Sequence, residues 1–154
     1  MKHMNTLPPI LIVTDRGHFV AYRLHPEGAA EVIDHTTFTE GVEKLGAQVT
    51  DKEGSFQTGS GGATGKVHAS GERLHLVAEL EHRCIRLIAE RVQKLLHEYT
   101  GLWAFAAPAE INGAIIELLP HDIVARLRIN LPKDLARIPS NEVPQHFLRA
   151  RNAS

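Results

Sequence analysis

Apolar residues in the first part of the chain form short runs that turn residues separate. The runs at 9–14, 18–24 and 30–38 contain many β-branched and aromatic residues, which favour extended structure. The sequences DRG at 15–17 and PEG at 26–28 lie between these runs and are typical of tight turns. Because short turns connect neighbouring antiparallel strands, the pattern predicts a meander of three consecutive strands.

The most sustained pattern is an apolar stripe with spacings of three and four in the middle of the chain. Ser70 is suited to cap a helix and Gly101 to end one, so the stripe predicts a long helix over residues 70–100. The buried face expected for this helix consists of Val77, Leu80, Cys84, Leu87, Ile88, Val92 and Leu95.

The last third of the chain alternates predicted strands and helices. The run LWAFAA at 102–107 has no polar alternation, which is typical of a central strand buried on both faces. Pro108 and Pro120 bracket a predicted helix at 109–119, and a last strand is expected at 124–131. A helical turn is expected at 121–125 and a frayed tail at 149–154. Between them we expect a short amphipathic helix that Ser140 caps, with apolar contacts from Val143, Phe147 and Leu148.

The order β-β-β-α-β-α-β-α predicts an α/β fold with a mixed five-stranded sheet and helices on both faces. Right-handed crossovers place the long helix against one face of this sheet. The same order is found in the ribonuclease H-like fold, and a fold by itself determines no function. With 154 residues, of which 43% are hydrophobic, we expect a single domain over 1–154 with its core at about 9–148.

Glycine is concentrated before the long helix. Residues 39–67 hold seven of the twelve glycines and little periodicity, apart from a short helix expected at 40–45. The stretch GSGGATG at 59–65 predicts a flexible loop within an insertion at about 50–68. Long loops inside a small domain are uncommon and often functional.

The net charge of -1 is the sum of opposed segments. Residues 27–57 carry seven acids and two lysines (net -5), whereas residues 126–154 carry six bases and two acids (net +4). Residues 66–94 carry six bases and four acids (net +2). All three segments can be ordinary solvated faces, or the two basic segments can form a surface that faces phosphate.

The chain shows no membrane-spanning segment and no signal peptide, so a cytoplasmic location is expected, without a membrane partner.

Residues suited to metal-dependent chemistry are present but incomplete. Ribonuclease H-like nucleases hold magnesium with carboxylates from the first strand, the long helix and the fourth strand. Asp15 is a candidate acid at the end of the first strand, and Glu79 or Glu81 lies on the helix. The fourth strand has no acid, since Glu110 lies beyond it and Asp134 follows the fifth strand.

The other candidate sites also have simpler explanations. His75, Glu79 and His82 share a helix face that is equally suited to solvent, and the other histidines show no ligand spacing. The glycine-rich loop lacks the first glycine and the hydroxyl of a nucleotide-binding loop, because Ser60 and Val67 occupy those places. Cys84 falls in the apolar stripe, where a thiol is inert. No catalytic residue, cofactor or bound metal is therefore expected.

Four pieces of the sequence together resemble a known family. They are VTDRG at 13–17, the glycine-rich loop before the long helix, AAP at 106–108, and LPKDL at 131–135 followed by Ile138-Pro139. The combination is similar to the bacterial host-attachment protein family, also labelled translational machinery proteins, over about residues 9–148. The attachment label describes a phenotype and implies no chemistry.

That family in turn resembles the middle domain of archaeo-eukaryotic class I peptide-release factors. In those factors a Gly-Gly-Gln loop precedes the long helix and enters the peptidyl-transferase centre. Gly61 and Gly62 match the two glycines, but Ala63 stands where the glutamine would, and Gln57 lies outside the motif. The resemblance therefore implies a place in translation without implying peptidyl-tRNA hydrolysis.

Three functional hypotheses remain. The first is a non-catalytic, translation-associated domain that contacts ribosome, rRNA or tRNA phosphates through a loop and a basic helix face. The second is a host-attachment or protein-interaction module, and the third is a hydrolase or nuclease. The contact residues expected for the first hypothesis are Gly59, Gly61, Gly62, Lys66, Arg73, Arg83 and Arg86.

Overall fold

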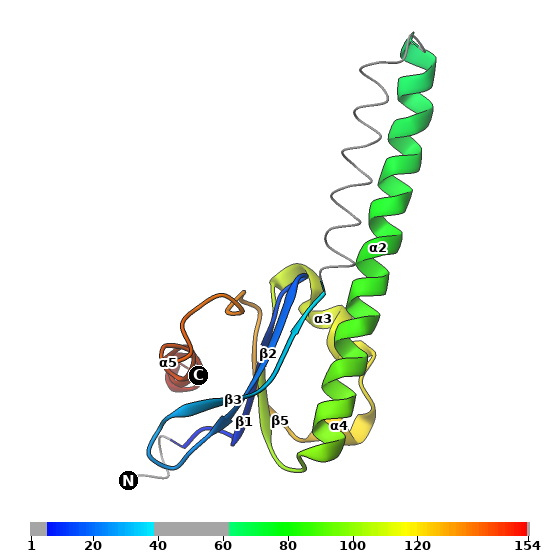
Figure 1. Cartoon of the computed structure of the whole chain (residues 1–154). Helices are drawn as coiled ribbons and strands as arrows, with labels where there is room; N and C mark the ends of the chain where they lie inside the picture. The colour runs from blue at the N-terminus through cyan, green and yellow to red at the C-terminus, as the bar shows by residue number, and fades with distance from the viewer. Residues whose placement is uncertain (1–5, 39–61, 154) are drawn as a thin grey trace.

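Five strands form one mixed sheet in the order β3-β2-β1-β4-β5 in the computed structural model (Figure 1). The structure describes residues 6–38 and 62–153. β1 is antiparallel to β2, and β2 to β3, whereas β4 is parallel to both β1 and β5. The strands are β1 (Ile10–Thr14), β2 (His18–Leu24), β3 (Ala30–Thr37), β4 (Trp103–Ala106) and β5 (Leu127–Leu131). The predicted mixed five-stranded α/β sheet is confirmed.

Helices cover both faces of this sheet, as predicted. α2, α3 and α4 pack on one face and α5 on the other (Figure 1). Every residue of β1 and β4 is buried because these central strands have helices on both sides. The helices are α2 (Gly62–Glu98), α3 (Ala109–Glu117), α4 (His121–Ala125) and α5 (Val143–Ala153).

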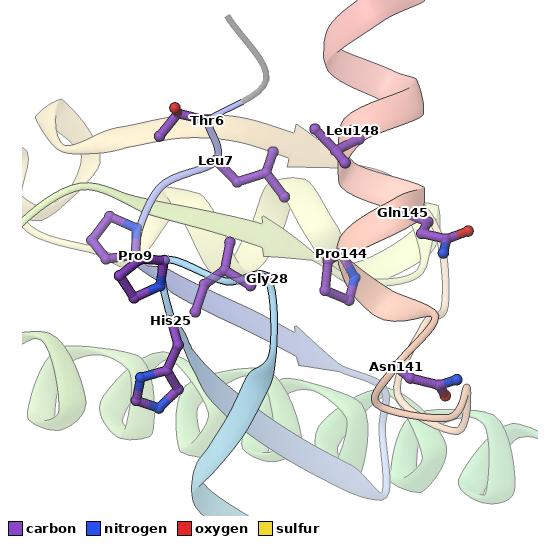
Figure 2. A pocket seen from close by; sticks show the side chains of 11 residues that line it. Thr6, Leu7, Pro9, His25, Gly28, Asn141, Pro144, Gln145 and Leu148 are labelled. Atoms are coloured by element: carbon purple, nitrogen blue, oxygen red, sulfur yellow. The ribbon is translucent and has the colours of Figure 1, made fainter. Parts of the chain in front are cut away.

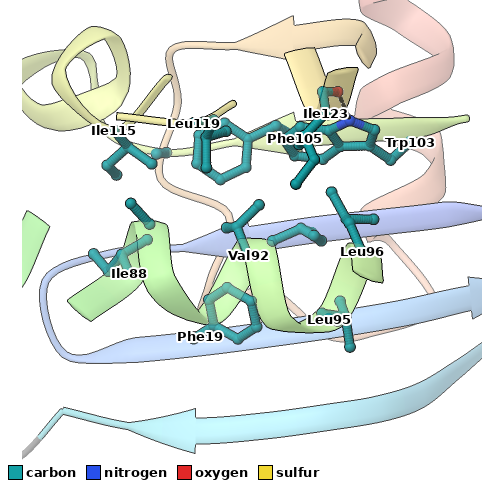
Figure 3. Packing of buried hydrophobic residues seen from close by; sticks show 14 of the residues in the cluster. Phe19, Ile88, Val92, Leu95, Leu96, Trp103, Phe105, Ile115, Leu119 and Ile123 are labelled. Carbon is teal, nitrogen blue, oxygen red and sulfur yellow. Dashed lines mark hydrogen bonds between the residues drawn. The ribbon is translucent and has the colours of Figure 1, made fainter. Parts of the chain in front are cut away.

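The larger core lies between α2 and the sheet (Figure 3). Ile88, Val92 and Leu96 of α2 face Phe19 of β2 and Phe105 of β4, and all five side chains are fully buried. The single tryptophan of the chain, Trp103, also lies in this core, where its indole Nε1 donates to the Ile123 carbonyl oxygen over 2.8 Å. This bond satisfies the only polar atom of the buried indole ring.

Several predicted boundaries are wrong. α2 begins at Gly62 and not at Ser70, so the loop expected at 59–65 is helical from Gly62 onwards. Leu87 is 38% exposed, and Ile85 is buried in the stripe instead. Residues 124–125 belong to α4 and not to the last strand. Ser140 precedes α5 by a turn and is not its cap. The tail at 149–153, which was expected to fray, is helical. The short helix expected at 40–45 lies outside the described residues.

The carboxyl end of α2 is held by its neighbours. α2 ends at Glu98, slightly before the predicted end at Thr100, so Gly101 lies three residues past the helix; its φ of +144° is a backbone conformation that non-glycine residues rarely adopt. Arg126 donates from Nη2 to the Leu96 carbonyl over 2.9 Å and from Nη1 to the Gly101 carbonyl over 3.1 Å. The first bond satisfies a carbonyl in the last turn of α2, and the second attaches the segment after the helix to the same side chain.

Candidate functional site at the carboxyl edge of the sheet

The turn after β1 is built around a buried carboxylate. Asp15 is 6% exposed, and its Oδ1 accepts hydrogen bonds from the backbone N–H groups of Gly17 at 2.8 Å and His18 at 2.7 Å. The hydroxyl of Thr14 donates to the His18 carbonyl over 2.7 Å. An aspartate that accepts bonds from the next residues is a standard way to close a tight turn. The VTDRG segment therefore has a local structural role.

The second oxygen of Asp15 connects this turn to a distant segment. Arg137, which follows β5, places its Nε 3.5 Å from Asp15 Oδ2, although its side chain is 74% exposed. The imidazole Nδ1 of His18 lies 3.4 Å from Oδ1. Both carboxylate oxygens of the candidate acid Asp15 are thus within reach of cationic or N–H groups of the chain.

A second ion pair attaches α2 to the same turn. Arg16 Nε donates to Glu81 Oε1 over 2.7 Å, and the Cys84 thiol donates to the Arg16 carbonyl over 3.0 Å. Burial raises the pKa of the Cys84 thiol to about 11, so the thiol is protonated at neutral pH. This agrees with the expectation that Cys84 is not a nucleophile.

α3 and β5 are joined by a pair of asparagines that the sequence analysis missed. Asn112 of α3 is buried, and its amide Nδ2 donates to Asn130 Oδ1 over 2.8 Å. Asn130 Nδ2 donates back to Asn112 Oδ1 over 2.8 Å, and Asn112 also reaches the Leu131 carbonyl at 3.1 Å. A signal was present in the sequence: Asn112 is a polar residue next to Ile111 on the expected apolar face of its helix.

Three of the four family-like pieces of the sequence meet at one edge of the sheet. The segments 13–17, 106–108 and 131–135 follow β1, β4 and β5, which run parallel to one another. The carboxyl ends of parallel strands lie at the same edge, where α/β proteins commonly place their sites. This carboxyl edge is therefore the candidate functional site.

The acids of a nuclease site are not brought together at this edge. Asp134 Oδ1 accepts from the Ala136 N–H at 3.2 Å, Glu81 is paired with Arg16, and Glu110 is exposed on α3. His75 and Glu79 lie 3.8 Å apart on the exposed face of α2. Within 6–38 and 62–153, no group of three or more histidine, cysteine or acidic side chains is suited to hold a metal ion.

α2 extends far past the carboxyl edge (Figure 1). Its 37 residues correspond to a length of about 55 Å. The first buried α2 side chain in the described part of the chain is Leu80, next to the Glu81 that pairs with Arg16. We call residues 62–79 the α2 arm. Gly62 lies at its far end, away from the sheet (Figure 1).

The predicted contact residues lie at different positions along the length of α2. Lys66 and Arg73 belong to the α2 arm, whereas Arg83 and Arg86 are exposed near its base. Gly59 and Gly61 lie outside the described residues.

None of the described helices is long and apolar enough to cross a membrane.

Comparison with known proteins adds one match. A family model described as "Protein required for attachment to host cells" matches residues 10–147, which include the whole sheet and the start of α5. A search of curated proteins finds no match.

Proposed function

The chain belongs to the family of proteins required for attachment to host cells, and we propose that it is a non-catalytic, translation-associated member that contacts ribosomal RNA. The proposed contact surface consists of the α2 arm and the exposed arginines at its base. The proposal extends the resemblance to release-factor middle domains, in which a glycine pair precedes the long helix.

One observation carries this proposal: α2 projects well beyond the sheet and has Gly62 at its far end (Figure 1). From Gly62 to Leu80 the helix rises about 27 Å. A helix that continues for this distance past its own core is suited to reach into a partner. Gly62 is thus suited to approach a backbone closely, since glycine has no side chain.

The charges near the arm favour phosphate contacts. Arg83 and Arg86 are exposed, and no ion pair among the described side chains involves either of them. Arg16 and Arg137 at the carboxyl edge are instead paired with Glu81 and Asp15. Arginine recognises phosphate through its planar set of N–H donors, and such contacts carry no base specificity.

The experiment is co-sedimentation of the full chain with purified ribosomal subunits over a salt series. Double substitution Arg83→Ala with Arg86→Ala should weaken binding. It should also lower the slope of log K against log salt by roughly 0.7 to 0.9 for each phosphate that the variant no longer neutralises. Lys94→Ala is a matched control because Lys94 is an exposed base near the opposite end of α2.

Two results would contradict the proposal. The first is no sedimentation of the chain with either subunit at low salt. The second is an equal loss of binding in the Lys94→Ala control, because this would indicate a general charge effect without a defined surface.

A second candidate function is a protein-interaction or attachment module, which the family description favours. Leu74 of the α2 arm is 72% exposed, so the arm presents some apolar surface as well as charge. Protease accessibility on intact cells separates the two functions. Degradation of the native chain by external protease would support the attachment function, whereas full protection together with ribosome binding would support the translation function.

A further inference from the structure

Two pockets in the described part of the chain differ in the charge of their lining residues. The first, of about 780 Å³, lies between the segment at 6–9, the β2–β3 turn and the start of α5 (Figure 2). Leu7 faces Pro144 and Leu148 across it, and no lysine, arginine, aspartate or glutamate is among its described lining residues. No charge therefore selects a partner for this pocket.

The second pocket has a positively charged lining. It measures about 610 Å³ and lies between the last turns of α2 and the start of α4, and we call it the α2–α4 pocket. Lys94, His97 and Arg126 line it, and Asp122 is the one acid among its described lining residues. Its volume falls in the range of roughly 300–1,000 Å³ that is typical of small-molecule sites. The size and charge of this pocket therefore suit a small anion.

Packed elements build the α2–α4 pocket. Leu96 of α2 and Ile123 of α4 line it and also belong to the larger core (Figure 3). Gln93 Nε2 donates to the Leu118 carbonyl over 3.5 Å, which attaches this part of α2 to the carboxyl end of α3. Residues that a packed core holds in position lose less conformational entropy when a ligand binds.

Main-chain carbonyls anchor Arg126 at the pocket. Its Nη1 donates to the carbonyls of Tyr99 and Gly101 over 3.4 and 3.1 Å, and its Nη2 donates to the Leu96 carbonyl over 2.9 Å. A neutral carbonyl fixes a guanidinium without cancelling its charge. No acidic side chain in the described part of the chain pairs with Arg126, so its positive charge remains available in the pocket.

One edge of the Arg126 guanidinium keeps donors for a ligand. Among the described residues, no acceptor bonds to its Nε–H, and Nη2 carries a second N–H beside the one that Leu96 accepts. Nε and Nη2 share an edge of the guanidinium plane, and such an edge binds two oxygens of a carboxylate or phosphate in parallel. Arg91 uses the same two atoms to bind both oxygens of Asp34, each over 2.8 Å.

Lys94 and His97 add further N–H donors from α2. They are three residues apart, so they lie on the same face of the helix, and both are exposed. Neither side chain forms an ion pair or a hydrogen bond with a described residue, and the same holds for Asp122 at the start of α4. The pocket thus combines three basic side chains with one carboxylate, all of them available to a ligand.

We propose that the α2–α4 pocket binds a small phosphate monoester whose organic part carries a hydroxyl group. The three basic side chains match the three terminal oxygens of the phosphate, whereas a carboxylate has two oxygens. Asp122 accepts a hydrogen bond from the hydroxyl group. The proposal is independent of ribosome binding, because the pocket lies at the end of α2 opposite the α2 arm.

RNA fits this pocket less well than a small phosphate ester. Its phosphates suit the basic side chains, but Asp122 repels the successive charges of a nucleic-acid backbone. Unpaired bases stack on aromatic rings, and no phenylalanine, tyrosine or tryptophan is among the described lining residues.

The experiment is an NMR titration of the ¹⁵N-labelled full chain with glycerol 3-phosphate. The expected result is a set of saturable amide shifts confined to residues 93–100 and 120–126. Glycerol should give no such shifts because it lacks the anion, and inorganic phosphate should bind more weakly because it lacks the organic hydroxyl group. Lys94→Ala should weaken binding of glycerol 3-phosphate about tenfold, as expected for the loss of a charge-assisted hydrogen bond. Asp122→Ala should remove the difference in affinity between glycerol 3-phosphate and inorganic phosphate.

Lys133→Ala is the matched control, because Lys133 is an exposed base that does not line the pocket. It should leave the affinity unchanged. Arg126→Lys keeps the charge but loses the paired donors, so it should weaken binding about tenfold or more. Thermal unfolding reports whether this variant is folded, and Lys94→Ala tests the pocket without a change to the core.

Several results would overturn the proposal. They are no saturable shifts at 93–100 and 120–126, equal binding of glycerol, and an equal loss of affinity in Lys133→Ala. Tighter binding of lactate or of an oligouridylate in the pocket would overturn it too, because the ligand would then be a carboxylate or RNA. Lys94→Ala should leave the ribosome salt series unchanged, so a failure here is distinguishable from a failure of the proposed RNA contact.

Discussion

Asp15 illustrates how a residue suited to catalysis is used for structure. Its position after the first parallel strand matches that of a metal-binding acid, yet one oxygen closes the turn to β2 and the other lies near Arg137. The only thiol of the chain, on Cys84, lies against the same turn and bonds to the Arg16 carbonyl. At the scale of single residues, the reactive groups of the carboxyl edge are occupied in holding the edge together.

Asp15→Ala should lower the free energy of unfolding by about 1–3 kcal/mol, because two half-buried N–H groups lose their acceptor. Asp15→Asn should cost less, since an amide oxygen still accepts from Gly17 and His18 and only the attraction to Arg137 is removed. Urea denaturation monitored through the buried Trp103 measures both values. An equal loss in the two variants would show that the charge, and not the turn, determines the effect.

The Cys84 thiol should resist Ellman's reagent at pH 8 in the folded chain and react rapidly in urea. Burial raises its folded-state pKa from 9.0 to about 11, so its contribution to stability is complete below pH 9 and is lost as pH rises toward 11. Cys84→Ala should show a smaller loss of stability over this pH range than the unmodified chain. Rapid labelling of the folded chain at pH 8 would contradict the assignment.

At the scale of elements, polar contacts fix how helices meet the sheet. Arg91 of α2 forms a bidentate pair with Asp34 of β3, in which both N···O distances are 2.8 Å. Arg126 satisfies the end of α2, and the Asn112–Asn130 pair holds α3 against β5. These contacts join different elements, so apolar periodicity did not predict which side chains meet.

Two glycine substitutions should have opposite signs. Gly101→Ala should lower the free energy of unfolding by about 1 kcal/mol, because φ +144° strains an L-residue although no atom lies within 4 Å of the added carbon. Gly113→Ala in α3 meets equally open space but helical geometry, so it should raise stability by about 0.5–1 kcal/mol. Thermal unfolding by circular dichroism compares the two, and effects of the same sign would refute the backbone explanation.

Asn112→Ala should destabilise the chain by about 1–3 kcal/mol, because it removes the partner of Asn130 and of the Leu131 carbonyl. A double-mutant cycle with Asn130→Ala isolates the contact between the two amides. The double variant should be more stable than the sum of the single losses predicts. Additive losses would show that the amide pair contributes no coupling.

At the scale of the whole molecule, α2 connects the buried core to the proposed contact surface. From Leu80 onwards its buried face packs against the sheet, whereas the α2 arm passes the carboxyl edge beyond the Arg16–Glu81 pair (Figure 1). The helix that stabilises the core is thus also the helix that presents the proposed surface.

Loss of binding at this surface should therefore be separable from loss of stability. The Arg83→Ala and Arg86→Ala double variant should weaken ribosome binding and change the free energy of unfolding by no more than about 0.5 kcal/mol, because both side chains are exposed. Urea denaturation and the salt series measure the two effects. A much larger loss of stability would show that the arginines act through the fold.

The sequence alone determined the element order, the central buried strands and the core face of the long helix, because these depend on local propensity and on the period of apolar residues. Its main error was at Gly62, where glycine content indicated a loop and the structure shows helix. Residue type states only a local preference, and context overrides it. Tertiary structure alone decided that segments 13–17, 106–108 and 131–135 meet at one edge, and that Asp15 faces Arg137. These are contacts between residues distant in sequence, and only the packing of the sheet and helices brings them together.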